Sequence, residues 1–170
     1  MLSTLMLAAG VLAILYTIAA YNRLITLRNR CDNQWSQIDI QLTRRSELIP
    51  KLVDYVREYA AHERSILEKV AVARSFMAAA KSIPEKAQAD KALKETLTNL
   101  YAVAEAYPQL KANENYLKLQ EELASTENKI AYARQFYNEI VQRYETLRQS
   151  FPANIIAGTL NQPKREYFNA

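Results

Sequence analysis

The first twenty residues, Met1–Ala20, constrain this chain most, because they contain no Lys, Arg, Asp, Glu, Asn, Gln or His. A helix rises about 1.5 Å per residue, so twenty helical residues span ~30 Å, the thickness of a bilayer's hydrocarbon core. A cleaved signal peptide would carry a basic segment before the apolar run and a small-x-small cleavage site. Here no basic residue precedes the run, and Thr17–Ala20 is a poor cleavage site. We therefore expect a retained transmembrane anchor over residues 1–20.

The charges on the two sides of this anchor differ. Arg23, Arg28 and Arg30 follow it, and no positively charged side chain precedes it. The positive-inside rule places the basic flank in the cytoplasm, and Tyr16 and Tyr21 suit an interfacial aromatic belt. The pattern predicts a single-pass protein of the cell (inner) membrane, with its N-terminus outside and the following domain in the cytoplasm.

One side of the anchor carries small residues at helical spacing. Ala9, Ala13 and Thr17 form a ridge, and Gly10 lies beside it. Small residues let transmembrane helices approach each other closely, although such a ridge alone is a weak signal.

The rest of the chain is polar and rich in helix formers, with only 2 Gly and 5 Pro in the whole sequence. This composition favours an all-α domain built of long helices. Apolar residues at spacings of three and four predict four helices, over residues 21–43, 47–81, 84–107 and 109–149. We expect three regions: the anchor at 1–20, a helical domain at 21–150 and a tail at 151–170.

The boundary between the first two helices of the domain is open to two interpretations. In the first, the chain turns at Arg44–Ile49, with Ser46 as N-cap, Glu47 in the first turn and Pro50 near the helix start. In the second, one very long helix continues through Pro50 with a kink. We favour the turn. The later boundary at Ser82-Ile83-Pro84-Glu85 is clearer, since Ser82 can cap a helix that Pro84 helps to start.

The tail does not have the composition of a disordered segment, which would be poor in aromatic and branched residues. Its apolar residues have no obvious reason to be exposed: Phe151, Ile155, Ile156, Tyr167 and Phe168. We expect the tail to dock on the helical domain or on a neighbouring subunit.

The sequence contains little material for catalysis. The single Cys31 excludes an internal disulfide and is interpreted as a small core residue. His62, the only histidine, lacks the second His of a zincin motif and the Glu of a Glu-x-x-His motif. Carboxylate pairs such as Asp54 with Glu58 fit a solvated helix face better than a cleft. We therefore predict no catalytic, cofactor-binding or metal-binding residues, no cofactor and no enzyme.

The net charge of +4 is modest, and its excess follows the membrane span. No basic cluster is interleaved with stacking aromatic residues, so we do not expect a nucleic-acid partner.

Several linked segments in order resemble the LemA family over nearly the whole chain. Four lie in the first half: Tyr21–Arg30, Trp35–Leu42, Arg44-Arg45 with Leu48-Ile49-Pro50, and Tyr59–Glu63. The others lie in the second half: Tyr107–Asn115, Glu121–Leu123, Glu127-Asn128, Ile130–Asn138, Phe151-Pro152, Ile155–Gly158 and Arg165–Phe168.

The resemblance implies a bacterial membrane protein with one N-terminal span and a cytoplasmic antiparallel four-helix bundle. It implies no established site residues. Some relatives are linked to organising intracellular membranes, and others are encoded near membrane proteases. We therefore expect a membrane-anchored, self-associating scaffold or adaptor whose partners are the lipid bilayer and copies of itself. The alternative is a regulatory partner of a membrane protease or of another envelope protein.

Overall fold

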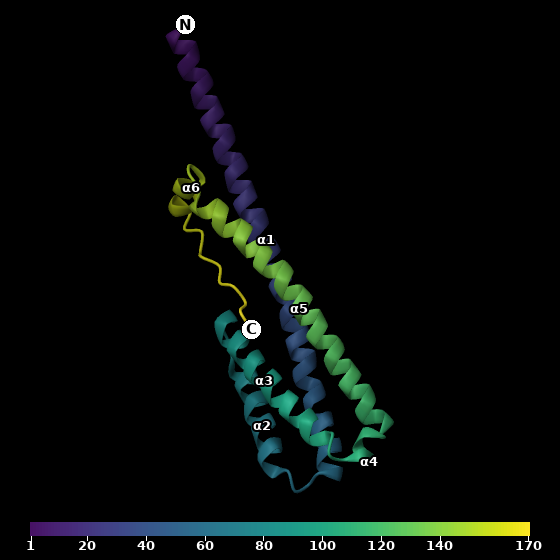
Figure 1. Ribbon diagram of the computed structural model, residues 1–170. Coiled ribbons are helices and arrows are strands. Elements are labelled where there is room, and N and C mark those ends of the chain that lie inside the picture. The colour runs from purple at the N-terminus through teal and green to yellow at the C-terminus, as the bar shows by residue number, and fades with distance from the viewer. The chain divides into compact units, whose positions relative to one another are not determined.

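The computed structural model describes residues 1–170, and it contains helices and no strands, which confirms the all-α prediction. Figure 1 labels the helices in chain order: α1 (Leu2–Tyr59), α2 (Arg64–Ala79), α3 (Ile83–Ala104), α4 (Pro108–Lys111), α5 (Glu114–Gln149) and α6 (Ala153–Thr159). The residues form two compact units. Unit 1 contains Met1–Trp35 and Phe136–Glu166, and unit 2 contains Ser36–Gln135 and Tyr167–Ala170.

Helix α1 passes from the apolar run into the polar part of the chain without a break at Ala20-Tyr21. No Gly or Pro stands at this junction, so nothing in the backbone interrupts the hydrogen-bond ladder. The apolar residues at spacings of three and four after Tyr21 are mostly buried. Trp35 is half-buried, and the other five are buried: Leu24, Leu27, Cys31, Ile38 and Leu42.

The predicted turn at Arg44–Ile49 is wrong, since α1 continues through this segment and contains Pro50 inside it. Proline has no N–H, so the carbonyl of Ser46 loses its usual donor four residues later. Arg74 of α2 replaces that donor, because its Nε donates to the Ser46 carbonyl oxygen over 3.3 Å. The continuous-helix interpretation is the correct one, and a side chain from another helix satisfies the backbone at the proline.

The single helix predicted over 47–81 is also wrong, because the chain breaks between Tyr59 and Arg64. The break contains no Gly or Pro, so its sequence carries no local stop signal. Tertiary contacts hold it instead: Asn113 Nδ2 donates to the Tyr59 hydroxyl over 3.3 Å, and the Tyr107 hydroxyl donates to Glu63 Oε1 over 3.4 Å. The interruption lets α2 lie beside the end of α1, where residues of both helices, Val53 and Val70 among them, line one small cavity.

Helix α3 begins as predicted. The Ser82 hydroxyl accepts from the Glu85 N–H over 3.3 Å, and the Glu85 carboxylate accepts from the Ser82 N–H over 3.0 Å. This reciprocal capping box satisfies two of the donors that a helix start leaves open. The predicted core stripe of α3 is buried throughout: Ala89, Leu93, Leu97, Leu100 and Ala104.

The long helix predicted over 109–149 is divided. Pro108 begins the short α4, and α5 then starts at Glu114. Asn113 explains the second start, because its Oδ1 accepts from the N–H groups of Asn115 at 3.0 Å and Tyr116 at 3.2 Å. Asparagine is among the best residues for this capping role.

The C-terminal segment contains α6 and then a tail without regular secondary structure. Asn161, with φ of 45°, adopts the left-handed conformation that commonly ends helices, and the Gln162 N–H donates to the Ala157 carbonyl over 2.9 Å. The apolar residues of the tail differ in how far their own chain covers them. Phe168 is fully buried, whereas Phe151, Ile155 and Tyr167 are exposed.

Candidate functional site

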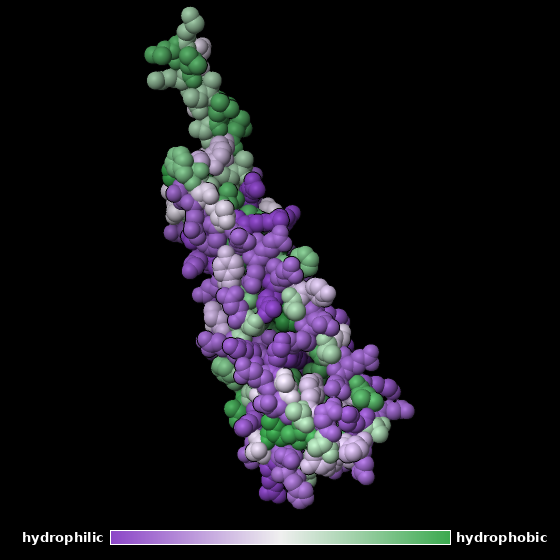
Figure 2. All heavy atoms as spheres, in the orientation of Figure 1, coloured by the Kyte–Doolittle hydropathy of each residue, from purple (hydrophilic) through white to green (hydrophobic).

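The N-terminal part of α1 has an entirely exposed apolar surface. None of the residues in its most apolar window is buried, and this is the one helix long and apolar enough to cross a membrane. Figure 2 shows the projecting end of this segment as mostly hydrophobic surface. Water-soluble proteins rarely expose so large an apolar surface, and where they do, the surface contacts a membrane or another protein.

Burial in α1 begins at the end of the apolar run. Ala20 is the first buried residue, and Leu24 and Leu27 follow it at helical spacing. The folded part of unit 1 therefore starts to cover α1 where the uncharged segment ends.

Polar contacts in unit 1 hold the tail against α5 and α1. The hydroxyls of Tyr137 and Tyr144 donate to the carbonyl oxygens of Glu166 and Pro163, each over 2.8 Å. The Arg165 guanidinium lies 2.9 Å from the Asp32 carboxylate.

Buried Glu145 is the centre of these contacts. It accepts hydrogen bonds from Arg148, from Gln149 and from the Arg165 N–H. Burial alone would raise the pKa of Glu145, but these donors together lower it below its ordinary value. Glu145 is therefore ionised at neutral pH and fixes the position of the tail.

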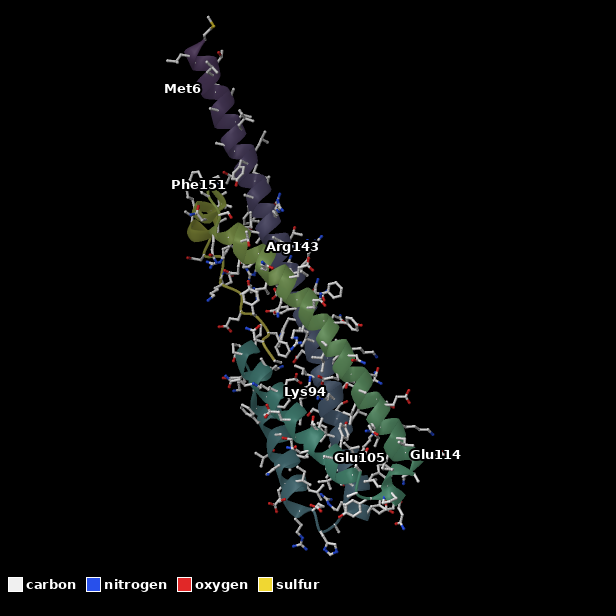
Figure 3. All side chains as sticks on the ribbon, in the orientation of Figure 1. Met6, Lys94, Glu105, Glu114, Arg143 and Phe151 are labelled. Atoms are coloured by element: carbon white, nitrogen blue, oxygen red, sulfur yellow. The ribbon has the colours of Figure 1, made fainter.

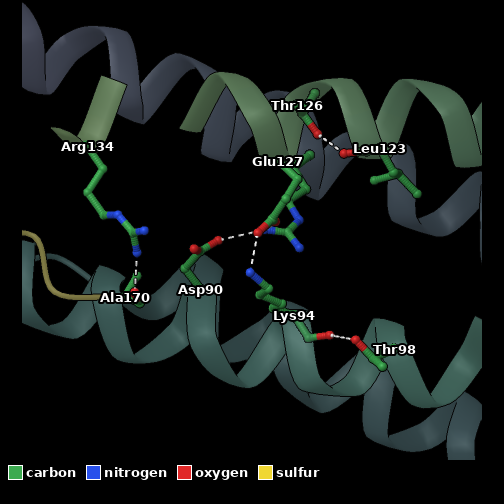
Figure 4. A network of polar contacts seen from close by, with 9 residues as sticks. Asp90, Lys94, Thr98, Leu123, Thr126, Glu127, Arg134 and Ala170 are labelled. Carbon is green, nitrogen blue, oxygen red and sulfur yellow. Dashed lines mark hydrogen bonds and ion pairs between the residues drawn. The ribbon is translucent and has the colours of Figure 1, made fainter. Parts of the chain in front are cut away.

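Unit 2 contains a buried ionic cluster formed by α1, α3 and α5 (Figure 4). The side chain of Arg45 is only 4% exposed, and its Nη1 lies 2.9 Å from Asp90 and 2.8 Å from Glu127. Lys94 of α3 also pairs with Glu127, over 2.6 Å. The cluster thus contains two cations and two carboxylates.

The two carboxylates respond differently to burial. Desolvation raises the pKa of Asp90, and the nearby Arg45 opposes that shift without cancelling it. Desolvation also acts on Glu127, but the hydrogen bond from Lys94 and the charges of Arg45 and Lys94 outweigh it, so its pKa is lowered. The two positive and two negative side chains compensate one another. Their ion pairs connect α1, α3 and α5 and hold these three helices in register.

A cavity of about 250 Å³ opens beside the cluster, and its lining includes Arg45, Lys94, Tyr101 and Glu127. Burial raises the pKa of the Tyr101 hydroxyl, so this group stays protonated. The cluster was not anticipated, although a signal for it exists. Arg45 continues the spacing of the apolar stripe from Ile38 and Leu42, and a charged residue on a core stripe calls for a buried partner.

A model of the LemA family matches residues 34–170. The chain belongs to the LemA family. The matched range covers the second part of α1 and every later helix, so it contains the ionic cluster and the tail contacts. The segment Tyr21–Arg30, which also resembles the family, lies before the matched range.

Two curated relatives of this LemA-family chain come from Paramagnetospirillum magneticum and are named magnetosome proteins MamQ 1 and MamQ 2. Each is 24% identical to it over 174 aligned positions, which cover 87% of this chain and 64% of the relative. The chain thus spans less than two thirds of the length of these relatives.

The residues weighed for chemistry in this LemA-family chain are Cys31, His62, and the pair Asp54 and Glu58. Cys31 is a free, buried thiol, and desolvation raises its pKa to about 11, which makes it a poor nucleophile at neutral pH. His62 is exposed in the link before α2, not on a helix as expected. Asp54 and Glu58 are both exposed, and Asp54 pairs with Arg57 on its own helix. No group of three or more His, Cys, Asp or Glu side chains is placed to hold a metal ion.

Proposed function

We propose that this LemA-family protein is a membrane-anchored, non-enzymatic scaffold or adaptor that self-associates and organises a membrane patch or a protein complex. The observation that carries the proposal is the unbroken course of α1, in which a fully exposed apolar segment continues into the folded part. A continuous helix couples the packing of the anchor in the membrane to the packing of the domain. The relatives named magnetosome proteins are compatible with a membrane role.

The helices are proposed to form an antiparallel four-helix bundle. The short connection between α2, which ends at Ala79, and α3, which begins at Ile83, supports this arrangement. Helices joined by a short loop pack beside each other in opposite directions.

The proposed location is the inner membrane, with the N-terminus outside and the domain in the cytoplasm, as the three arginines after the span indicate. Protease added to intact spheroplasts of a Gram-negative host should leave a C-terminal tag intact, and lysis should expose the tag to cleavage. Cleavage of the tag in intact spheroplasts would show the opposite orientation. A periplasmic marker protein and a cytoplasmic one serve as controls.

The small-residue ridge of α1 is a candidate contact between copies. Ala9 and Ala13 are exposed, and a Cβ added at Gly10 would meet no neighbouring atom within the chain. The Thr17 hydroxyl already donates to the Ala13 carbonyl over 2.8 Å, so the ridge offers close packing and needs no polar partner.

Crosslinking in native membranes tests self-association, and it separates this function from the alternative. We expect products at multiples of the chain's mass, and we expect Ala13→Ile on the ridge to weaken them more than Leu12→Ile beside it. A strictly monomeric protein, both in membranes and after mild detergent extraction, would contradict the scaffold proposal.

The alternative is a regulator that binds another membrane protein, such as a protease. A groove of about 540 Å³ between α2 and α3 favours it, because Val72 and Phe76 are exposed there beside Glu68 and Lys69. In the crosslinking experiment, this function predicts products whose mass includes a second protein. Val72→Ser in the groove should abolish those products, whereas Ala13→Ile should not.

A further inference from the structure

Helix α6 buries its small apolar residues, whereas large apolar side chains in and directly beside it are exposed. Its small residues Ala153 and Ala157 are buried, with exposures of 1% and 4%. The larger Ile155 is 58% exposed and Ile156 is half-buried, and Phe151, two residues before the helix, is 80% exposed. Leu160, directly after the helix, is also exposed. A water-soluble helix normally covers its large apolar residues and leaves small or polar ones outside.

The contacts within unit 1 show where along α1 this surface lies. The rings of Trp35 and Tyr137 are 5.7 Å apart. Closer to the anchor, Arg23 of α1 and Ser150, just after α5, line one cavity. The separation between Arg23 and Trp35 along α1 is nearly equal to the separation between Tyr137 and Ser150 along α5 and its end.

Phe151 follows Ser150 directly, so the start of α6 lies at the level of Ala20 and Tyr21, where the apolar run ends. Figure 3 labels Phe151 at the end of α5, beside the N-terminal part of α1.

We propose that Phe151, Ile155 and Leu160, here called the α6 face, are inserted into the interfacial layer of the same bilayer that α1 crosses. This proposal rests on the proposed membrane anchoring of α1 and adds a second point of membrane contact. It identifies the partner of the α6 face as a lipid surface, at the boundary between headgroups and acyl chains.

Continuity with the anchor is the reason to assign this face to lipid. Amphipathic helices that lie on membranes place large apolar side chains about 5–10 Å into the boundary layer. Tyr21 is exposed at the same level, as aromatic residues of an interfacial belt are. The exposed Arg23 is placed to reach anionic headgroups with its long side chain. Two contacts with the bilayer would fix the tilt of the domain, which one helix cannot do.

Fluorescence quenching by brominated lipids tests the proposal in the full chain. Because Trp35 is the only tryptophan, a Trp35→Phe background leaves a single reporter in each variant and keeps an aromatic ring against Tyr137.

The reporters are Phe151→Trp and Ile155→Trp, and the matched control is Phe136→Trp, which replaces another exposed phenylalanine of unit 1. The control lies roughly 20 Å further along the helix axis. Leu12→Trp reports on the anchor. Each variant is reconstituted in phosphatidylcholine–phosphatidylglycerol vesicles, and its fold is checked by circular dichroism.

Lipids brominated near the headgroup end of the chains should quench Phe151→Trp and Ile155→Trp by half or more and leave Phe136→Trp unchanged. Lipids brominated near the chain ends should quench Leu12→Trp most. If Leu12→Trp is quenched and the α6 reporters are not, the α6 proposal fails and the anchor stands. If no reporter is quenched, both proposals fail. Blue-shifted but unquenched emission at Phe151→Trp would show that protein covers the face, which also overturns the proposal.

Discussion

Replacing Arg45 with methionine is expected to lower the free energy of unfolding by about 3–5 kcal/mol, the usual cost of removing one partner of a buried ion pair. Methionine is unbranched and apolar and fills much of the volume of the arginine stem, so the loss comes mainly from the stranded Asp90 carboxylate. Glu127 keeps Lys94 at 2.6 Å, whereas Asp90, with a side chain only 6% exposed, loses its 2.9 Å partner. Guanidinium titration of the protein in detergent, followed by circular dichroism, measures the change.

Arg44, the residue directly before Arg45, provides a matched control. Arg44 is half exposed and lies 3.7 Å from Glu122, a geometry in which an ion pair contributes about 1 kcal/mol or less. Arg44→Met should therefore be nearly neutral. Equal losses in Arg44→Met and Arg45→Met would show that the buried cluster has no special role in stability.

The effect of Arg45→Met should depend on pH. The pKa of Asp90 is already raised in the folded protein, so its contribution to stability declines as pH rises through that pKa. Without Arg45 its pKa rises further, and the pKa of Glu127 rises as well. The destabilisation is therefore full at neutral pH and shrinks in acid, where both carboxyls take up protons. A loss that stays constant over this range would mean that packing, not charge, is responsible.

A second substitution separates the effect of charge from the effect of packing. Adding Asp90→Asn to Arg45→Met removes the stranded charge and keeps the shape of the side chain. The double variant should recover a substantial part of the lost stability at neutral pH and little in acid.

Deleting residues 2–19 is expected to move the protein from the carbonate-resistant membrane fraction to the soluble fraction. The deletion keeps Ala20, the first buried residue of α1, and removes only residues that are exposed. The remaining protein should stay helical, with thermal unfolding close to that of the full chain. Cell fractionation and circular dichroism measure the two expectations.

Two point variants serve as a matched pair for the deletion. Leu12→Arg places a charge near the centre of the span, which costs about 2.5–3.5 kcal/mol of insertion free energy. Leu117→Arg changes an exposed leucine of α5 and should leave fractionation unchanged. If the shortened protein remains in the carbonate-resistant fraction, α1 is not the main attachment. If it keeps the oligomeric state of the full chain, the anchor is not required for assembly.

Most core residues of the helices could be predicted, because the helical period of apolar residues places them on one face. Leu93, Leu97 and Leu100 recur at the helical period, and the structure buries all three. The capping box of Ser82 with Glu85 is equally local, since both residues lie within one turn. The ionic cluster was harder, because Arg44 and Arg45 look alike in the sequence. Continuing helical geometry through the expected turn would have placed Arg45 on the core stripe.

The sequence by itself determined the apolar N-terminal segment, the all-α class, most of the buried stripes and the start of α3. Each of these depends on residues close together in the chain and on the periodicity of a helix. Only the tertiary structure decided where α1 ends. Arg74 supplies the donor that Pro50 lacks, so the helix passes the proline. Distant side chains, including Asn113 and Tyr107, bind at Tyr59 and Glu63, so the chain breaks where its own residues favour a helix. These contacts join residues far apart in the chain, and no local pattern encodes them.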